Sequence, residues 1–114
     1  RGSSKRVPLR FPWQLVLAGK SAHIGKFDPA HKEIGEWIGQ IETIGIERSF
    51  ALFKTKEKKT GILIYASGAV RYFSSESHLR DFVDRNFPGT HLPALIPVEN
   101  FHDLIWRAIE KKGR

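Results

Sequence analysis

Residues 46–73 contain three short runs of β-branched and aromatic residues, and turn sequences separate them. The runs cover residues 46–54, 62–66 and 69–73. The charged stretch 55–61 lies between the first two, and Ser67-Gly68 lies between the last two. This pattern is typical of an antiparallel β-meander. We therefore expect a three-strand meander at the centre of the fold.

The strands of this meander are apolar on both faces. Phe50 and Leu52 point to one side, and Ala51 and Phe53 point to the other. A sheet with a single covered face would instead alternate apolar and polar residues. The second face is thus expected either to lie under helices or to be presented to a partner.

The N-terminal part of the chain predicts a basic arm and then a strand. Residues 1–10 contain Pro8 and show no periodic pattern, which favours a flexible arm. The apolar stretch 11–18 predicts a first strand, with Pro12 at an edge or outside the ladder. Residues 23–27 are expected to pair back as a short second strand after a turn at 19–21.

Residues 28–45 predict a helix. Asp28-Pro29 is a favourable helix start, and Gly45 is placed to end the helix. Against this, Gly35 and Gly39 each cost about 1 kcal/mol relative to alanine inside a helix. The competing interpretation is a strand over 37–46 with a glycine bulge. The apolar residues at helical spacing are Ile34, Trp37, Ile38, Ile41 and Ile44.

Two further helices are predicted in the C-terminal part. The first runs from Ser74 to about Asn86, with serine caps and an early glutamate at its start. The second begins near Pro97 and runs to the C-terminal lysines, which suit the negative end of the helix dipole. Its apolar stripe is Val98, Phe101, Leu104, Ile105, Ala108 and Ile109.

The predicted fold class is α+β, with residues 11–114 as a single domain. An antiparallel sheet, made of the N-terminal strand or hairpin and the meander, packs with one helix before the meander and two after it. Several nucleic-acid-binding folds use a helix–three strands–helix order, including the double-stranded-RNA-binding domain, whose second helix starts with lysines. The corresponding residues 74–78 have no lysine. A pleckstrin-like barrel capped by the C-terminal helix requires more strands than this pattern supplies.

Composition excludes several classes of protein. The 114 residues are 40% hydrophobic and 27% charged, and no apolar run approaches the roughly 20 residues that cross a bilayer. The absence of cysteine removes disulfides and thiolate chemistry. The short apolar stretch after the basic arm does not predict a signal peptide. We expect an intracellular, reducing location, cytoplasmic or nuclear.

No catalytic constellation is evident. The five histidines have no metal-ligand spacing, so no metal or other cofactor is expected. Glu57-Lys58-Lys59 has the Glu-x-Lys form of metal-dependent nucleases, but that chemistry requires a strand and a second acid. A non-catalytic protein is expected, with such a nuclease as the enzyme alternative.

The net charge of +7 lies on the arm and on the charged turn. This distribution predicts a phosphate-binding surface with neighbouring aromatic rings for base stacking, and hence a small nucleic-acid-binding module. The alternative is a protein-interaction domain that docks through the apolar sheet face or the helix bearing Trp37. A third possibility is attachment of the basic arm to a membrane surface. The predicted cations are Lys5, Arg6, Arg10, Lys54, Lys56, Lys58, Lys59 and Arg71; the predicted stacking or partner-binding aromatics are Trp13, Trp37, Phe53, Tyr65 and Tyr72.

Overall fold

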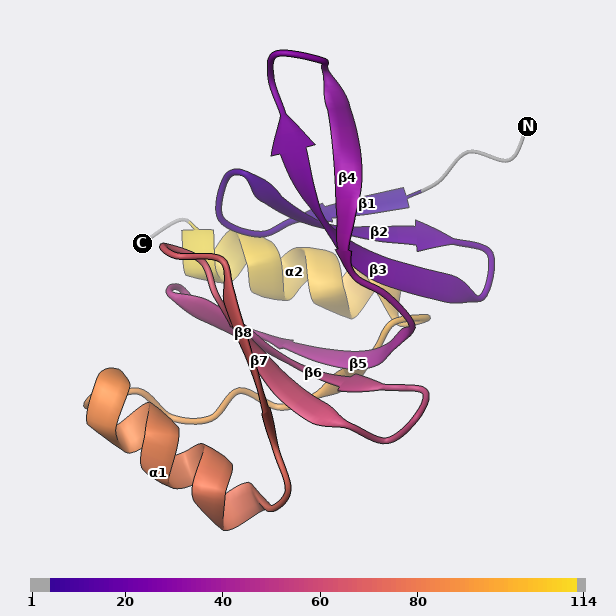
Figure 1. Cartoon of the computed structure of the whole chain (residues 1–114). Coiled ribbons are helices and arrows are strands. Elements are labelled where there is room, and N and C mark those ends of the chain that lie inside the picture. Colours follow the sequence, from indigo (N-terminus) through magenta and orange to yellow (C-terminus); the bar gives the residue numbers. More distant parts are fainter. Residues whose placement is uncertain (1–4, 113–114) are drawn as a thin grey trace.

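The computed structural model describes residues 5–112, which form two antiparallel sheets and two helices (Figure 1). The first sheet has the order β1-β2-β3-β4 and the second the order β8-β7-β6-β5-β9. The first sheet consists of β1 (Lys5–Pro8), β2 (Trp13–Ala18), β3 (Ser21–Asp28) and β4 (Glu33–Ile38). The second consists of β5 (Ile41–Ile46), β6 (Phe50–Thr55), β7 (Thr60–Ile64), β8 (Ala69–Phe73) and β9 (Ile96–Pro97). The helices are α1 (Glu76–Asn86) and α2 (Phe101–Lys112).

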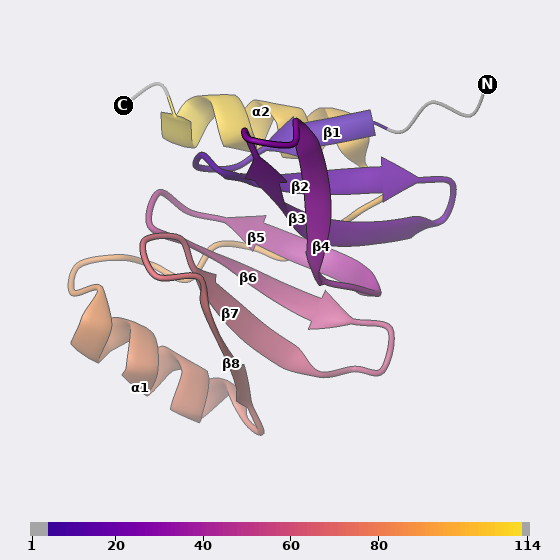
Figure 2. The ribbon, with the colours of Figure 1, turned by 45° about the horizontal axis from the view of Figure 1, so that its top comes forward.

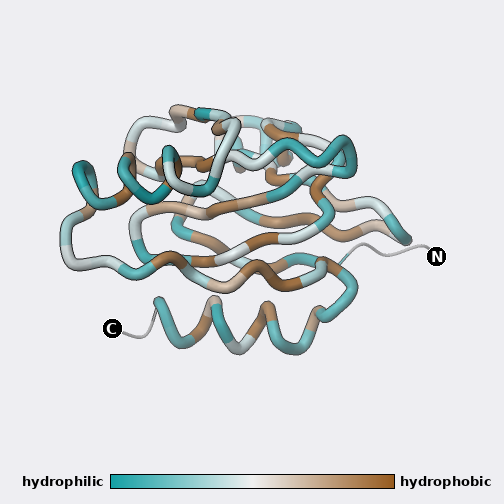
Figure 3. Tube along the Cα trace, turned by 90° about the horizontal axis from the view of Figure 1, so that it is seen from below, coloured by the Kyte–Doolittle hydropathy of each residue, from teal (hydrophilic) through white to brown (hydrophobic). Residues whose placement is uncertain are grey.

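The main core lies between the two sheets and under α2. It contains Leu15 and Ile24 from the first sheet, Ile44 and Phe53 from the second, and Leu104 from α2, all of them fully buried. The helix contacts β1 and β5, one strand from each sheet. Figure 2 shows α2 and the first sheet on one side of the second sheet and α1 on the other. In Figure 3, α2 lies below the strands and alternates between hydrophobic and hydrophilic residues, as a helix covering a core requires.

The other face of the second sheet packs on α1. Phe50 and Leu52 of β6 and Ile62 of β7 form a second buried cluster with Leu79 and Val83 of α1. Ala51 and Phe53 belong to the main core instead. Both faces of this strand are therefore buried, which accounts for its continuous apolar sequence.

The expected meander is present as β6, β7 and β8, and both C-terminal helices are present. The second helix begins at Phe101 and not near Pro97, because Ile96–Pro97 pairs with β5 as β9. Phe50 pairs with Ile64 across β6 and β7, and Leu63 pairs with Val70 across β7 and β8. The N-terminal hairpin is also present as β2 and β3, with Pro12 just outside the ladder. The fold class is α+β, as expected, but the hairpin and the meander belong to two separate sheets and not to the single sheet that was expected.

The expected helix over 28–45 is wrong, because these residues form the β3–β4 turn, β4 and β5. Asp28 accepts a hydrogen bond from the Ala30 amide (3.0 Å) in a tight turn and does not cap a helix. The chain turns again at Gln40, which has a positive φ of 56°, and the ladder shifts register between Ile41 and Thr43. These two irregularities give apolar strand residues the spacing of a helical stripe. The competing strand interpretation was closer.

Residues 5–10 also differ from the expected flexible arm. Lys5–Pro8 form β1, which pairs with β2, and both Val7 and Leu9 are buried in the main core. The expected arm is therefore part of the first sheet from residue 5 onward, while its residues 1–4 lie outside the described range.

The helix–three strands–helix order does not hold within residues 5–112, since strands occupy the position of its first helix. The pleckstrin-like alternative required more strands than the sequence pattern predicted, and β1, β4 and β5 are such additional strands. The C-terminal helix α2 covers the core. Neither α1 nor α2 is long and apolar enough to cross a membrane, and residues 5–112 contain no other helix.

Candidate functional site

Five lysines from two separate hairpin turns gather at one end of the molecule, which we call the lysine end. The Lys56 ammonium donates to the Lys20 carbonyl at 3.3 Å, so the β2–β3 and β6–β7 turns are in contact. The Lys56 amide also donates to the Gln40 carbonyl at 2.9 Å. Figures 1 and 2 both show the two turns on the same side. The five lysines are Lys20, Lys54, Lys56, Lys58 and Lys59.

The β6–β7 turn is closed by its own hydrogen bonds. Thr55 accepts from Lys58 and donates to Lys59 through the backbone, each at 2.9 Å. The Thr55 hydroxyl also accepts from the Lys59 amide at 3.2 Å. These bonds fix the turn around buried Thr55, and Lys56, Lys58 and Lys59 in it are exposed.

Two glutamates partly offset this positive charge. Lys58 contacts Glu42 at 2.8 Å, and Lys59 contacts Glu57 at 3.7 Å. The hydrogen bond from Lys58 lowers the pKa of Glu42 below its ordinary value, and the charges of Lys54 and Lys56 lower this pKa further. Three of the lysines thus lower the pKa of Glu42. With five lysines and two glutamates, the lysine end keeps an excess of positive charge.

A groove of about 620 Å³ borders the lysine end and runs to the first turn of α1. Lys54 and Lys58 line one side of it, and Arg80 and His91 also contribute. The Ser75 hydroxyl caps α1 by accepting from the His78 amide at 3.3 Å. The sequence shows no lysine at this helix start, but β6 and the β6–β7 turn bring Lys54 and Lys58 to it.

Lys5 and Arg6 lie near the lysine end. In register, Lys5 is opposite Leu17, close to the β2–β3 turn that carries Lys20. The Lys5 ammonium lies 5.2 Å from the centre of the Phe101 ring, and Arg6 is exposed on β1. Both can extend the cationic surface along the edge of the first sheet.

The other two predicted cations do not join this surface. Arg10 lies in the β1–β2 loop and lines a different cavity, together with Tyr65. The Arg71 guanidinium lies 5.0 Å from the ring centre of Phe82 on α1.

Three of the five predicted aromatics are in the core. Trp13, Phe53 and Tyr65 are buried, and the Trp13 indole donates to the Tyr65 carbonyl at 2.9 Å. Stacking on a nucleotide base requires an accessible ring. The structure therefore contradicts a stacking role for these three.

The remaining two aromatics are about half exposed. Tyr72 pairs with Gly61 next to the β6–β7 turn, and 53% of its surface is accessible. Trp37 is 47% exposed, but its indole donates to the Gly68 carbonyl at 3.1 Å, in the β7–β8 turn. Of these two aromatics, Tyr72 is thus the closer in the ladder to the lysine end. Trp37 lies on a strand and not on the expected helix.

Sequence reasoning missed two exposed features. Lys20 joins the site only through its long-range contact with Lys56, for which the sequence carries no signal. Trp106 is 69% exposed on α2, and Ile109, which was expected in the apolar stripe, is 53% exposed. A helical wheel centred on Leu104 and Ala108 would have placed Trp106 on the outer face.

No group of three or more histidine, aspartate or glutamate side chains suited to a metal ion occurs among residues that the structure describes. Glu57 lies in an exposed turn and pairs with Lys59, so the Glu-x-Lys sequence is not on a strand.

Comparison of the chain with protein-family models, curated proteins and solved structures finds no match.

Proposed function

We propose that this protein is a non-catalytic module that binds the phosphate backbone of nucleic acid through the lysine end. The observation that supports this most directly is the contact between the Lys20 and Lys56 turns, which unites cations from two hairpins. Lysines in such an arrangement can each contact a phosphate and release counterions. An intracellular location, cytoplasmic or nuclear, belongs to this proposal.

The charges of α1 favour binding that is independent of base sequence. Reading base edges requires a helix or a β-ribbon that enters a groove of the duplex with suitable side chains. On α1, two arginines are offset by three acids, so this helix offers no basic face. Phosphate contacts set position and affinity without sequence information. The charged residues of α1 are Glu76, Arg80, Asp81, Asp84 and Arg85.

The groove beside the lysine end gives the backbone a path across the protein. A strand that follows it would pass Lys54 and Lys58 and reach the first turn of α1, where free amides favour anions. The ring beside this path is that of Phe73, whereas Tyr72 lies on the opposite face of β8 against Phe53.

The test is fluorescence anisotropy with labelled single- and double-stranded DNA and RNA between about 50 and 200 mM salt. About four phosphate contacts would give a slope of log affinity against log salt near −3 to −4. The variant Lys56→Glu/Lys59→Glu should lose most of this affinity. The control Arg85→Glu/Arg107→Glu makes the same change in net charge on exposed helix positions and should retain it.

Two results would contradict the proposal. One is the absence of binding at the lowest salt. The other is an equal loss in the lysine variant and in the helix control, which would indicate attraction by net charge alone.

A second candidate function, docking of a protein partner, is favoured by the outer face of α2. The apolar sheet face expected to serve this role is covered by α1. Trp106 and Ile109 are instead the large apolar residues that α2 exposes. Tryptophan is enriched among residues that dominate binding energy at interfaces. In affinity capture, Trp106→Ser should lose this partner while Lys56→Glu/Lys59→Glu retains it.

A further inference from the structure

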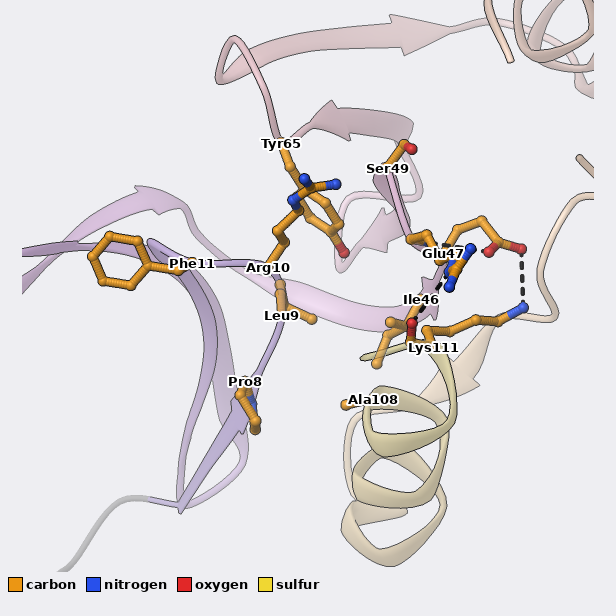
Figure 4. A pocket seen from close by; sticks show the side chains of 11 residues that line it. Pro8, Leu9, Arg10, Phe11, Ile46, Glu47, Ser49, Tyr65, Ala108 and Lys111 are labelled. Atoms are coloured by element: carbon orange, nitrogen blue, oxygen red, sulfur yellow. Dashed lines mark hydrogen bonds and ion pairs between the residues drawn. The ribbon is translucent and has the colours of Figure 1, made fainter. Parts of the chain in front are cut away.

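A cavity of about 410 Å³ opens at the end of the molecule opposite the lysine end. Its walls come from the β1–β2 loop, the β5–β6 turn, Tyr65 and the last turns of α2 (Figure 4). These segments are distant in sequence and are held together by the core beneath them. The volume falls in the range of small-molecule sites.

The hydroxyl of Tyr65 has no hydrogen-bond partner within the described part of the chain, although it is buried. The backbone of the same residue is well held: its amide donates to the Ser49 carbonyl at 3.1 Å, and its carbonyl accepts from Trp13. Figure 4 shows the Tyr65 ring beside Arg10, with the hydroxyl toward the space between Leu9 and Ile46. A buried donor in this state is costly unless an acceptor reaches it.

The Tyr65 hydroxyl remains a donor over the whole physiological range. Burial raises the pKa of Tyr65 well above that of an exposed tyrosine, and the nearby charge of Glu47 raises it further. A ligand that satisfies this O–H donor must therefore offer an acceptor atom.

The charged groups around the cavity favour an anion as that acceptor. Arg10, Arg48 and Lys111 are cationic, and Glu47 is the acid among the lining residues. Glu47 is already engaged, since it pairs with Lys111 at 3.2 Å and accepts from the Arg48 amide at 3.0 Å. Its negative charge is compensated, and the balance of the lining remains positive.

The rest of the wall is apolar. Leu9 and Ile46 belong to the main core, Ala108 is a buried residue of α2, and Phe11 is exposed at the β1–β2 loop. Phe11 is the part of this apolar wall that lies against water, because it is 70% exposed. An apolar body next to the anionic head would cover it.

We infer that this cavity binds a small anion with an apolar body, whose carboxylate or phosphate oxygen accepts a hydrogen bond from Tyr65. The positive charge of Arg10 attracts the anionic head group, and Leu9 and Ile46 contact the apolar body. This site is separate from the lysine end and does not depend on the proposed nucleic-acid binding.

The experiment is NMR titration of the full chain with four probes to about 10 mM, a range in which millimolar ligands are detected. Phenylacetate and phenyl phosphate carry the two anionic heads, phenylacetamide is the neutral analogue, and phenethylamine is the cationic one. At least one anion should bind about tenfold or more tighter than the amide, as expected for a charge-assisted hydrogen bond. Shifts should cluster at Tyr65 and at the residues that line the cavity.

Tyr65→Phe removes the hydroxyl and keeps the ring, so it should reduce the preference for anions over the amide to about twofold or less. Tyr72→Phe is the matched control, because these are the two tyrosines of the chain and Tyr72 lies outside the cavity. Arg10→Gln should weaken anion binding without changing the fold, since Arg10 is exposed.

The inference is overturned if no probe binds, if the amine or the amide binds as tightly as the anions, or if Tyr65→Phe binds the anions like the unmodified protein. Chemical-shift changes that lie mainly at the lysine end would overturn the inference as well, because they would report attraction of anions to the lysines.

Discussion

At the scale of single residues, Gly61 allows the ring of Phe53 to lie against β7. A Cβ atom at position 61 would come within 2.6 Å of the Phe53 Cζ and 3.0 Å of the Arg71 carbonyl oxygen. Phe53 is fully buried, so its ring has little room to shift. We expect Gly61→Ala to lower the free energy of unfolding by about 1–3 kcal/mol.

The control for Gly61 is Gly35, where a Cβ would meet nothing within 4 Å. Gly35→Ala should leave stability unchanged or raise it by about 0.4–1 kcal/mol, through the lower entropy of the unfolded chain. Urea denaturation of both variants checks the contrast. Equal stability of the two variants would show that the Phe53 ring can shift to accommodate the added methyl group at little cost.

Glu42 gives a pH-dependent prediction at the same scale. Its pKa is lowered in the folded state, chiefly by Lys58, so the pair stabilises the fold above the unfolded pKa of glutamate, about 4.3. This contribution is lost as the pH falls through the lower, folded pKa. Lys58→Gln should therefore be less stable than the unmodified protein near neutral pH, and the gap should close in acid.

A carboxyl-detected NMR titration checks this directly. The pKa of Glu42 should lie below the ordinary glutamate value and should move back toward it in Lys58→Gln. A stability gap that stays constant from neutral pH down to pH 3 would assign the effect of the substitution to something other than this pair.

At the scale of elements, Trp37 fastens β4 to the β7–β8 turn of the other sheet. Its indole donates to the Gly68 carbonyl at 3.1 Å, and its ring meets Trp13 edge to face at 5.3 Å between centres. Trp37→Ala loses both contacts and should cost about 1–3 kcal/mol. Trp106→Ala, at an exposed helix position, should change stability by less than about 0.5 kcal/mol. Thermal unfolding of the two variants checks this contrast, and an equal cost would contradict the fastening role.

The element scale also shows what the sequence can predict. The presence of the meander, the first hairpin and both C-terminal helices was correctly predicted, because each has an uninterrupted period and clear turn residues. The expected start of the second helix near Pro97 was wrong, because residues 96–97 pair with β5. The region 28–45 was wrong because the turn at Gln40 and the bulge after Ile41 imitate a helical period. Strand β1 was missed because Val7 and Leu9 are too few apolar positions to form a pattern.

The candidate site was predictable only in its local part. The lysines of residues 54–59 are close in sequence, so their clustering can be predicted without knowledge of the tertiary structure. Lys20 joins them through a tertiary contact, and Tyr65 is removed from the surface by packing. Single-sequence patterns carry neither kind of long-range information.

At the scale of the whole molecule, α2 joins the two sheets by contacting β1 and β5. Leu104 is fully buried among residues of both sheets, so a substitution that removes its packing contacts should destabilise the two sheets together. We expect Leu104→Ala to cost about 2–5 kcal/mol. Ile109→Ala on the exposed face of the same helix should cost less than about 1 kcal/mol.

One shared core also predicts a single cooperative transition. Urea unfolding followed by tryptophan fluorescence reports mainly Trp13 and Trp37 between the sheets, whereas far-UV circular dichroism also reports the helices. The two signals should have the same midpoint, and Leu104→Ala should lower both by the same amount. If the circular dichroism midpoint alone fell, α2 would unfold separately and the two sheets would hold together without it. Coincident midpoints would mean that the lysine end and the cavity opposite it belong to one folding unit, joined through α2 and the core.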